Sequence, residues 1–411
     1  MKKIISMIVT LMLLCACVQK PLVAHQELKL VIASDIHYFL KDYYQECEWF
    51  EESMMYSDGK MVTYADKILD AFVAEMKIQK PDLIILTGDL SFNGEKGSHQ
   101  GLAEHLMKLK DEGIHVAVLP GNHDVDNINA KGYGKDDYME VAKTDAKDFE
   151  NIYQDLGYDI AVNKHENSLS YRIDLNDDYS LVMLDTTSHE QTTQTALDIG
   201  GLLSEKTYSW LQTELGQIEK ENRRPLIAMH HNLVDHNELL NRGYTIRDNQ
   251  KIIELFEQYH VPFVFSGHIH CQNIKKANTI YDIASSSLLD APLQYGIVEL
   301  NATAMNYQTH SLKISKDANQ YFDEVSRNRF MESFETVKDQ KRRDAMLDVL
   351  VKANRYFFAG EMNEHIDEIK NMAGYSYFYD KQMGLDSFYR QYLESMLNEK
   401  ESSQNLTLKF S

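Results

Sequence analysis

The sequence is poor in cysteine, proline and positive charge. Its 411 residues include four cysteines and six prolines, and 42 Lys and Arg residues against 63 Asp and Glu residues give a formal net charge of -21. Four cysteines are too few for a scaffold built on disulfides. An acidic surface repels long polyanions, so the composition argues against a partner that is a nucleic acid polymer. It permits a small phosphorylated ligand, because bound metal ions can reverse the sign of the charge locally.

The cysteines divide into two pairs with different surroundings. Cys15 and Cys17 lie within the first twenty residues, whereas Cys47 and Cys271 lie in the body of the chain. Two states of the second pair stay open: a disulfide between them, or two free buried thiols. We expect the free thiols, because so few cysteines form no disulfide framework.

The first twenty residues have the composition of a targeting signal. Two lysines precede a mostly apolar run over residues 4–14, which is too short for a spanning helix of about 20 apolar residues. The run ends at Leu14-Cys15-Ala16-Cys17, which resembles a bacterial lipobox with Cys17 as the lipidated residue. We therefore expect residues 1–20 to be a lipoprotein signal peptide, and a lipid anchor to hold the protein at the extracytoplasmic face of the bacterial cell membrane. If the lipobox is not used, the protein is secreted.

The length of the chain and its periodicity predict two domains, since 411 residues exceed what one hydrophobic core organises. Leu28 to Ser34, Leu83 to Thr87 and His115 to Leu119 are short apolar runs typical of buried parallel strands. Tyr64 to Gln79 has the apolar spacing of a helix. This alternation predicts an α/β domain over residues 28–314.

Two segments differ from this alternation. Tyr38 to Met61 is polar, aromatic and acidic, so we expect a long loop there. Beyond residue 316 there are no prolines, and Asn319 to Arg342 and Asp344 to Phe358 have a helical period. We therefore expect residues 316–411 to form a C-terminal domain that is all helical.

Five short motifs carry metal-ligating side chains directly after predicted strands. They are Asp35-Ile36-His37, Gly88-Asp89, Gly121-Asn122-His123-Asp124, His230-His231 and Gly267-His268-Ile269-His270. Ligands bind at the carboxyl ends of the strands of an α/β sheet, and carboxylate, amide and imidazole groups gathered there make a metal site. The motifs contain no cysteine, which argues against a structural zinc site. One such motif alone is a common accident, but five in one chain predict a metal centre.

In its five motifs and their order, the sequence resembles the calcineurin-like metallophosphoesterases. The family pattern is D-x-H, G-D, G-N-H-[DE], H and G-H-x-H, and every element is present over residues 28–314. The resemblance implies an α/β sandwich of two mixed sheets flanked by helices. It also implies two divalent metal ions, and the ligand types suit Mn, Fe or Zn alike.

The resemblance implies a role for each motif residue. One metal ion would be bound by Asp35, His37 and His270, the other by Asn122, His230 and His268, and Asp89 would bridge the two. A hydroxide held between the metal ions would attack the phosphorus atom. His123 would protonate the leaving oxygen, and Asp124 would orient the ring of His123. For His231, support of the metal ligands and a solvated position in the loop both stay open.

The substrate is narrowed by features around the metal motifs. The stretch from Gly88 to Glu95, together with the lipobox and the helical C-terminal region, resembles bacterial lipoprotein phosphoesterases related to cyclic-nucleotide phosphodiesterases. The implied reaction is hydrolysis of a small phosphodiester, a cyclic nucleotide. The alternatives are a phosphomonoesterase or nucleotidase, a surface lipoprotein that binds a partner, and a solute-binding lipoprotein, whose role would leave the metal motifs without a use. Five aromatic residues near the motifs could stack on a base or pack the loop: Tyr38, Phe39, Tyr43, Tyr44 and Phe92.

Overall fold

The computed structural model describes residues 20–55, 59–187, 199–380 and 387–410. The expected signal peptide, with Cys17, lies outside the described residues apart from Lys20. Within the described ranges, none of the helices is both long and apolar enough to cross a membrane.

The first sheet has six strands in the order β15-β14-β13-β1-β2-β3. β1, β2 and β3 run parallel to one another, and β13 pairs antiparallel with β1. Each of the three parallel strands is a short apolar run that is almost completely buried, as expected for a sheet covered on both faces. The bounds are β1 Leu28–Ala33, β2 Leu83–Leu86, β3 His115–Val118, β13 Gln294–Asn301, β14 Ala304–Ser311 and β15 Asn405–Lys409.

The second sheet has seven strands in the order β11-β12-β10-β9-β8-β7-β6. β8, β9, β10 and β12 are parallel, and β6, β7 and β11 are antiparallel to their neighbours. The bounds are β6 Asn163–Lys164, β7 Tyr171–Asp174, β8 Tyr179–Leu184, β9 Arg224–Met229, β10 Phe263–Ser266, β11 Asn273–Ala277 and β12 Ile280–Ala284. A short ribbon pairs β4 (Gly132–Tyr133) with β5 (Tyr138–Met139).

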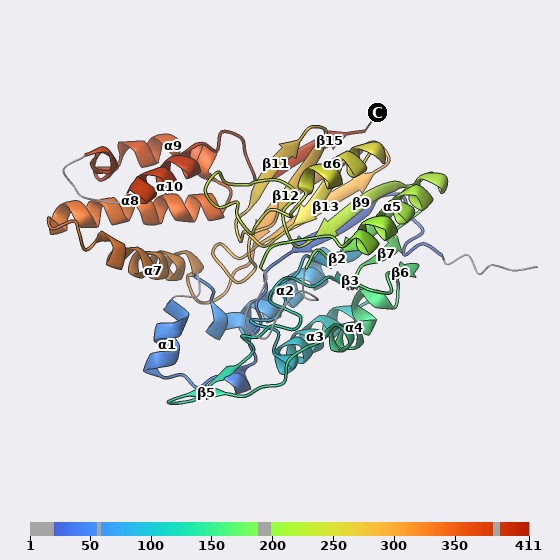
Figure 1. Cartoon of the computed structure of the whole chain (residues 1–411), viewed down its shortest axis with the longest axis horizontal. Coiled ribbons are helices and arrows are strands. Elements are labelled where there is room, and N and C mark those ends of the chain that lie inside the picture. The colour runs from blue at the N-terminus through green and yellow to red at the C-terminus, as the bar shows by residue number, and fades with distance from the viewer. Residues whose placement is uncertain (1–19, 56–58, 188–198, 381–386, 411) are drawn as a thin grey trace, which may run out of the picture.

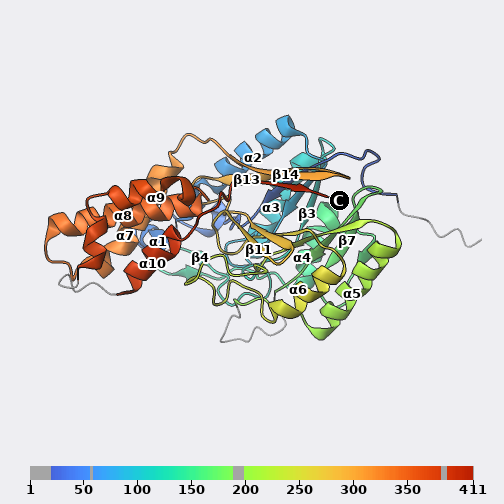
Figure 2. The same ribbon diagram turned by 90° about the horizontal axis from the view of Figure 1, so that it is seen from above.

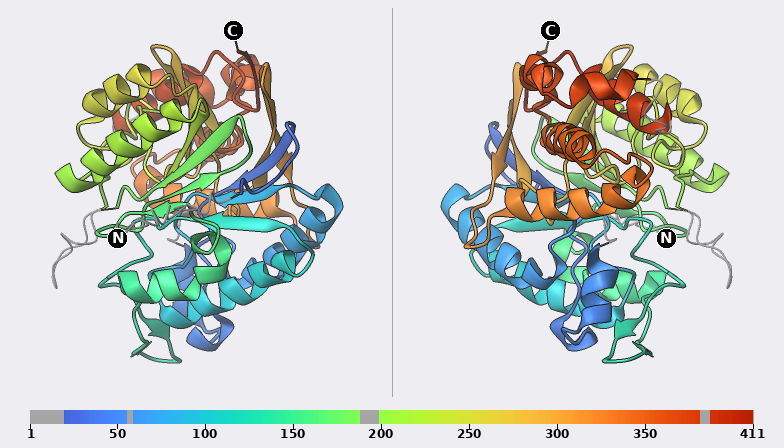
Figure 3. Two further views of the ribbon diagram at one scale, coloured as in Figure 1. Left: turned by 90° about the vertical axis from the view of Figure 1, so that its right-hand side faces the viewer. Right: turned by 90° about the vertical axis from the view of Figure 1, so that its left-hand side faces the viewer.

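Helices cover the outer face of each sheet, and the two inner faces share one hydrophobic core (Figure 3). The first sheet is covered by α2 (Ala65–Gln79), α3 (Lys96–Lys110) and α4 (Ala146–Ile152), and the second by α5 (Glu205–Lys220) and α6 (Asn249–Gln258). Two mixed sheets flanked by helices confirm the predicted fold class.

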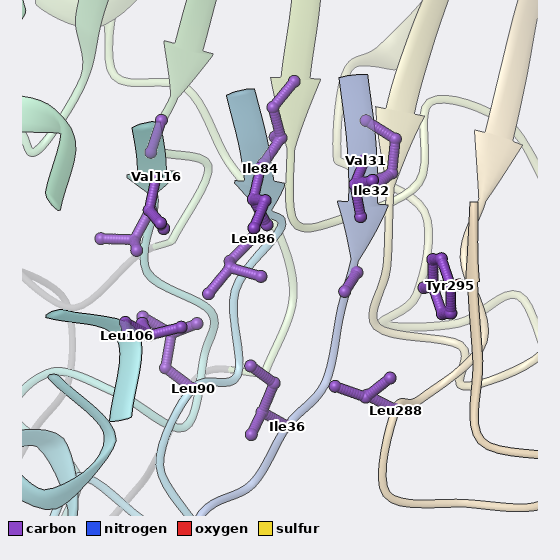
Figure 4. Close-up of a cluster of buried hydrophobic side chains, with 14 of the residues drawn as sticks. Val31, Ile32, Ile36, Ile84, Leu86, Leu90, Leu106, Val116, Leu288 and Tyr295 are labelled. Atoms are coloured by element: carbon purple, nitrogen blue, oxygen red, sulfur yellow. The ribbon is translucent and has the colours of Figure 1, made fainter. Parts of the chain in front are cut away.

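The core extends beneath the loops that follow β1 and β2. Ile36 and Leu90 are completely buried, and Figure 4 shows them just beyond the ends of these two strands. Each is a direct neighbour of a motif carboxylate, Asp35 or Asp89. The apolar residue therefore anchors each loop in the core and fixes the direction in which the polar residue beside it points.

The helices α7 to α10 lie together at one end of the molecule (Figures 1 and 2) and surround a second hydrophobic cluster. Ile269 and Cys271, next to the candidate metal ligands, belong to that same cluster, so the helices are fixed to the loop after β10. The bounds are α7 Ala318–Met331, α8 Gln340–Phe358, α9 Met362–Asn371 and α10 Ser387–Leu397.

Two expectations about local structure need correction. The C-terminal region is helical from α7 to α10, but it ends in the strand β15, which pairs with β14. The alternation of Leu406 and Leu408 with polar residues fits an edge strand with one face on the core. The segment from Tyr38 to Met61 is also not all loop, because it contains the helix α1 (Glu48–Met55). Phe50 and Met54, four residues apart, bury one face of that helix.

Candidate active site

The five motifs meet at one place because each follows the carboxyl end of a strand. Three come from β1, β2 and β3 of the first sheet, and two come from β9 and β10 of the second. Five of the candidate ligands have left-handed backbone conformations, with φ between 42° and 68°. Such conformations are costly for residues other than glycine and gather at functional sites. The five are Asp35, His37, Asp89, His268 and His270.

The first group of candidate ligands contains Asp35, His37, Asp89 and His270, with ligand atoms that all lie within 4.8 Å of one another. The Nε2 atoms of His37 and His270 face each other at 3.1 Å. Carboxylate oxygens of Asp35 and Asp89 lie 3.4 Å and 3.6 Å from these nitrogens. Two imidazole nitrogens this close to each other and to carboxylates are stable together when a proton or a cation lies between them, so these residues fit a metal ion.

The second group contains Asp89, His230 and His268. The Nε2 atom of His230 lies 3.4 Å from Asp89 and 3.0 Å from Oδ1 of Asn122. Asp89 belongs to both groups, which is the position predicted for a bridging carboxylate. The structure thus brings together all seven residues that the sequence predicts as metal ligands.

Hydrogen bonds to the outer nitrogens orient the histidine rings. His230 donates from Nδ1 to the Thr87 carbonyl at 2.8 Å, and His268 donates from Nε2 to the Gly243 carbonyl at 2.9 Å. His270 is held through Nδ1 by a carboxylate oxygen of Asp290 at 3.0 Å. Each bond leaves the other ring nitrogen with a lone pair for a metal ion. Sequence reasoning missed Asp290, although the residue lies soon after strand β12.

Buried charges in the site are balanced by the neighbouring imidazoles. Burial opposes ionisation of Asp89, but His230 and His123 outweigh it and hold the pKa of Asp89 well below its usual range. Burial also disfavours charge on His230, but Asp89 raises the pKa of His230 to about 9. Burial raises the pKa of Asp35 despite the opposing effect of His270. A divalent ion would replace the imidazole proton as the partner of these carboxylates.

Comparison with known proteins places this arrangement in a family. The family model described as calcineurin-like phosphoesterase matches residues 28–272, which is more than half of the chain. The chain belongs to the calcineurin-like phosphoesterase family. A second model, the C-terminal domain of cyclic nucleotide phosphodiesterase, matches residues 302–403. The family indicates that this phosphoesterase is a hydrolase.

Individual relatives are distant. A 3′,5′-cyclic-nucleotide phosphodiesterase of Nostoc sp. is 23% identical over 53% of this chain and 68% of its own. A protein of Coxiella burnetii named a probable cyclic nucleotide phosphodiesterase is 26% identical over 46% of this chain, and the match spans 60% of that relative. The crystal structure of a dimetal phosphatase from Danio rerio has a TM-score of 0.52 at 11% identity, covering 70% of this chain and 97% of that one. At this identity the likeness shows the fold alone.

In the phosphoesterase, His123 borders the candidate metal centre without belonging to either ligand group. Its Nδ1 lies 2.9 Å from the Phe92 carbonyl and 3.0 Å from Oδ1 of Asn93. Its Nε2 lies 4.0 Å from a carboxylate oxygen of Asp89, and the side chain is 29% exposed. Because the Nδ1 hydrogen is used by the carbonyl, Nε2 is the nitrogen that can exchange a proton with a ligand.

The expected contact between Asp124 and the ring of His123 is not what the structure shows. The Asp124 carboxylate accepts hydrogen bonds from the backbone N–H groups of Leu90, Ser91 and Gly121. It therefore ties the loop after β2 to the loop after β3. The ring of His123 is oriented by Phe92 and Asn93 instead, because the two neighbouring side chains point in different directions from the same loop.

His231 is completely buried, so its predicted alternative as a solvated loop residue is wrong. Its Nδ1 lies 2.8 Å from the Thr186 hydroxyl, and its Nε2 lies 3.0 Å from the Ile199 carbonyl. The ring contacts those of His230 and His268, with centroids 5.1 Å and 4.6 Å away. His231 thus packs behind two candidate ligands and supports their positions.

A pocket of about 650 Å³ opens over the metal centre, and its lining includes Asp89, Asn122, His123 and Lys60. Lys60 was missed by sequence reasoning. It is only 7% exposed, and its charge helps to lower the pKa of His123, after burial and against Asp89. The backbone beside it is fixed, since Met61 donates to the Leu289 carbonyl at 3.0 Å.

The aromatic residues near the motifs pack the loop after β1. Phe39 stacks on Tyr44 at 5.6 Å and contacts Phe92 at 5.0 Å, and all three are buried. They do not line the pocket in the part of the chain that the structure describes, so the packing interpretation is confirmed. Cys47 and Cys271 are both free thiols, as expected, but only Cys271 is buried, and Cys47 is partly exposed.

Proposed function

We propose that the protein is a dinuclear, metal-dependent phosphodiesterase that hydrolyses cyclic nucleotides. The observation that carries the proposal is the sharing of Asp89 by two groups of candidate ligands at the base of one pocket. The family indicates phosphoester hydrolysis, and the names of the relatives support a cyclic nucleotide as substrate.

The candidate ligands would hold two divalent ions, with Mn, Fe and Zn all suited to the set of imidazole, carboxylate and amide donors. When bound, such ions offset the negative charge of a phosphoester and lower the pKa of water. Asp290, Thr87 and Gly243 hold the histidine ligands in orientations that leave the inner nitrogens available.

The charge of the pocket supports an anionic substrate. Lys60, Arg242 and Arg329 line it, and Asp89 is the one acidic side chain among its described lining residues. The chain as a whole carries a formal charge of -21, whereas the Lys, Arg and Asp side chains that line the pocket are positive in sum. Such a site concentrates small anions. Lys60 lines the same pocket as Asp89 and Asn122, and we assign to it a contact with an oxygen of the scissile phosphate.

His123 is suited to the proton transfer of the reaction. Its Nδ1 is held by the Phe92 carbonyl, and the side chain lines the pocket. We assign to Nε2 the delivery of a proton to the leaving oxygen of the ester. The proton comes from the doubly protonated ring, which returns to the neutral form with its hydrogen on Nδ1. Asn93 and Phe92 then act as positioning residues, because they fix the ring.

The test is a substrate panel with defined metal content. The full-length protein is stripped of metal, restored with Mn, Fe or Zn, and assayed on 3′,5′- and 2′,3′-cyclic nucleotides and on matched monoesters. Metal-dependent diesterase activity well above monoesterase activity supports the proposal. The preferred cyclic nucleotide then shows whether the substrate has a 3′,5′ or a 2′,3′ ring. Monoesterase activity alone would overturn the substrate class, and no turnover at full metal occupancy would overturn the enzymatic role.

We also propose that the enzyme acts at the extracytoplasmic face of the bacterial cell membrane, anchored through a lipid on Cys17. The support is the sequence pattern at residues 1–20. Metabolic labelling with a radioactive fatty acid should label the wild-type protein and not the Cys17→Ser variant. Equal labelling of both proteins would contradict the anchor.

A further inference from the structure

The pocket has a second wall, made by the helical C-terminal region. α7 contributes Ser326 and Phe330, α8 contributes Asn354 and Phe358, and α10 contributes Tyr389 and Tyr392. The candidate metal centre and these three helices thus face the same space of about 650 Å³, a volume in the range of sites for small molecules.

Three neutral polar side chains on this wall form one hydrogen-bonded row. The Tyr392 hydroxyl donates to Oδ1 of Asn354 at 2.6 Å, and Nδ2 of Asn354 donates to the Ser326 hydroxyl at 3.3 Å. All three residues are buried, and each comes from a different helix. Polar groups between packed helices are costly unless they are hydrogen-bonded. An asparagine amide also has a second N–H group and a second acceptor site to offer to a ligand in the pocket.

Aromatic rings flank the polar row. Phe358 lies four residues after Asn354 on α8, and Phe330 lies four residues after Ser326 on α7, so each shares a helix face with one member of the row. Phe358 contacts Phe322 with ring centroids 5.2 Å apart, which holds its ring in place. Rings of this kind provide flat apolar surfaces on which a nucleobase can stack.

We propose that the wall formed by α7, α8 and α10 is the subsite for the nucleobase of the substrate, and that Asn354 and Tyr392 determine which base is accepted. This inference rests on the proposed function. The phosphate lies at Lys60 and the metal centre, while the base lies against the opposite wall. The neutral donors and acceptors read the edge of the base, and the aromatic rings supply affinity that does not depend on the base. Arg329 on α7 adds one positive charge to the lining of the pocket.

The test uses the full-length, metal-loaded protein and compares two kinds of diester. The four common nucleoside 3′,5′-cyclic phosphates carry a base, whereas methyl p-nitrophenyl phosphate is a diester without one. For Asn354→Leu and Tyr392→Phe, the ratio of kcat/KM on the preferred cyclic nucleotide to kcat/KM on the small diester should fall about tenfold, the size of one lost hydrogen bond. The spread of kcat/KM among the four bases should narrow in the same variants.

A control variant on the same helices separates recognition from stability. Arg355 on α8 donates to Asp323 on α7 at 2.7 Å, and neither residue lines the pocket. In Arg355→Gln, the ratio of kcat/KM on the cyclic nucleotide to kcat/KM on the small diester should equal that of the wild type. The spread of kcat/KM among the four bases should also be unchanged. The assignment of the subsite would be overturned if the Asn354 and Tyr392 variants lost kcat/KM equally on both diesters. It would also be overturned if the spread of kcat/KM among the four bases did not change.

Failure of the proposed function has a different signature. If the wild type hydrolyses none of the diesters, the function fails. Isothermal titration calorimetry with nucleoside 5′-monophosphates still tests the subsite, because binding needs no turnover. The subsite is supported if the wild type binds the four monophosphates with different Kd values and these differences disappear in Asn354→Leu. Equal Kd values for all four monophosphates in the wild type would overturn the subsite.

Discussion

On one side of the pocket, buried carboxylates and imidazoles extend from the ends of five strands, and several adopt left-handed backbone conformations. On the other side, neutral polar groups, aromatic rings and the Arg329 guanidinium extend from three helices. The strand ends are held by two sheets and a common core. The helical wall has its own core and contacts the metal side through Ile269 and Cys271.

From this difference we expect the metal side to carry out the reaction and the helical wall to select the substrate. Under the proposed function, residues at the strand ends contact the phosphate and the atoms next to it, which every phosphoester offers. Residues on the helical wall then face the part of the substrate that varies. Variants on the metal side should therefore have effects that do not depend on the base of the substrate, whereas the effects of variants on the wall should depend on it.

The largest effect is expected for Asp89→Asn. The carboxylate belongs to both ligand groups, so its loss weakens both metal sites at once. Activity on cyclic nucleotides and on the small diester should fall together by at least about 1,000-fold, and elemental analysis should show less bound metal. Wild-type metal content with unchanged turnover would contradict the bridging position.

His123→Asn should slow the reaction and leave the metal ions bound. The side chain borders the centre but belongs to neither ligand group. Loss of a general acid should lower kcat on cyclic nucleotides by about 100- to 1,000-fold, whichever base they carry. The loss should shrink for esters whose leaving group has a low pKa, because such a group needs no proton. An equal loss for all leaving groups, at full metal occupancy, would exclude the assigned proton transfer.

Lys60→Gln should weaken productive binding of the phosphate by about 10- to 100-fold in kcat/KM, as expected for a lost hydrogen bond from a charged group. The loss should be the same for substrates with and without a base. Lys275→Gln is a suitable control, because Lys275 pairs with Glu399 and does not line the pocket. A loss confined to cyclic nucleotides would instead place Lys60 in the base subsite.

Asp290→Asn should weaken metal binding by about tenfold, the lower end of the effect of removing a hydrogen-bond partner from a histidine ligand. Asp290 contacts the outer nitrogen of His270 and does not line the pocket. Titration of the stripped protein with Mn or Zn measures the affinity directly. Activity should return at high metal concentration, and a loss that no metal concentration restores would assign another role to this carboxylate.

The sequence made the metal side predictable because each ligand lies in a motif directly after an apolar strand. The strand ends of the two sheets meet at one edge of the sandwich. A position directly after a strand therefore became a position in the site for His37, Asp89 and His270. The role of Asp124 was not predictable in the same way. Two neighbouring residues in a loop point in different directions, and only the backbone geometry shows that Asp124 binds N–H groups of Leu90 and Ser91.

Residues outside the motifs reach the site only through tertiary structure. Lys60 lies in a segment whose sequence resembles an exposed loop, and its position follows from the backbone bond of Met61 to Leu289. Asn354 and Tyr392 belong to helices whose apolar spacing predicts packing but not what they face. The arrangement of α7, α8 and α10 against the metal side, which no periodicity encodes, therefore decides which of their residues line the pocket.

The last expected effect concerns stability rather than activity and comes from the metal side, where charge is buried. Glu95 is completely buried, and one of its oxygens accepts a hydrogen bond from the Asn93 backbone at 3.0 Å. Burial raises the pKa of Glu95 from 4.5 to about 7. Between these two values the folded protein binds more protons than the unfolded chain, so the stability that Glu95 contributes falls as the pH rises from about 4.5 to 7.

Glu95→Gln removes this dependence, because an amide keeps the acceptor and carries no charge. Relative to the wild type, the variant should gain stability by about 1–3 kcal/mol between pH 5 and pH 8, which is a few degrees in Tm. Calorimetry in the presence of a chelator measures the difference in Tm between Glu95→Gln and the wild type without the pH dependence of metal binding. Glu104→Gln on the exposed face of α3 is the matched control. A gap in Tm that stays constant across this pH range would show that Glu95 is ionised in the folded protein throughout, and the metal side would then hold one more buried charge than its hydrogen bonds suggest.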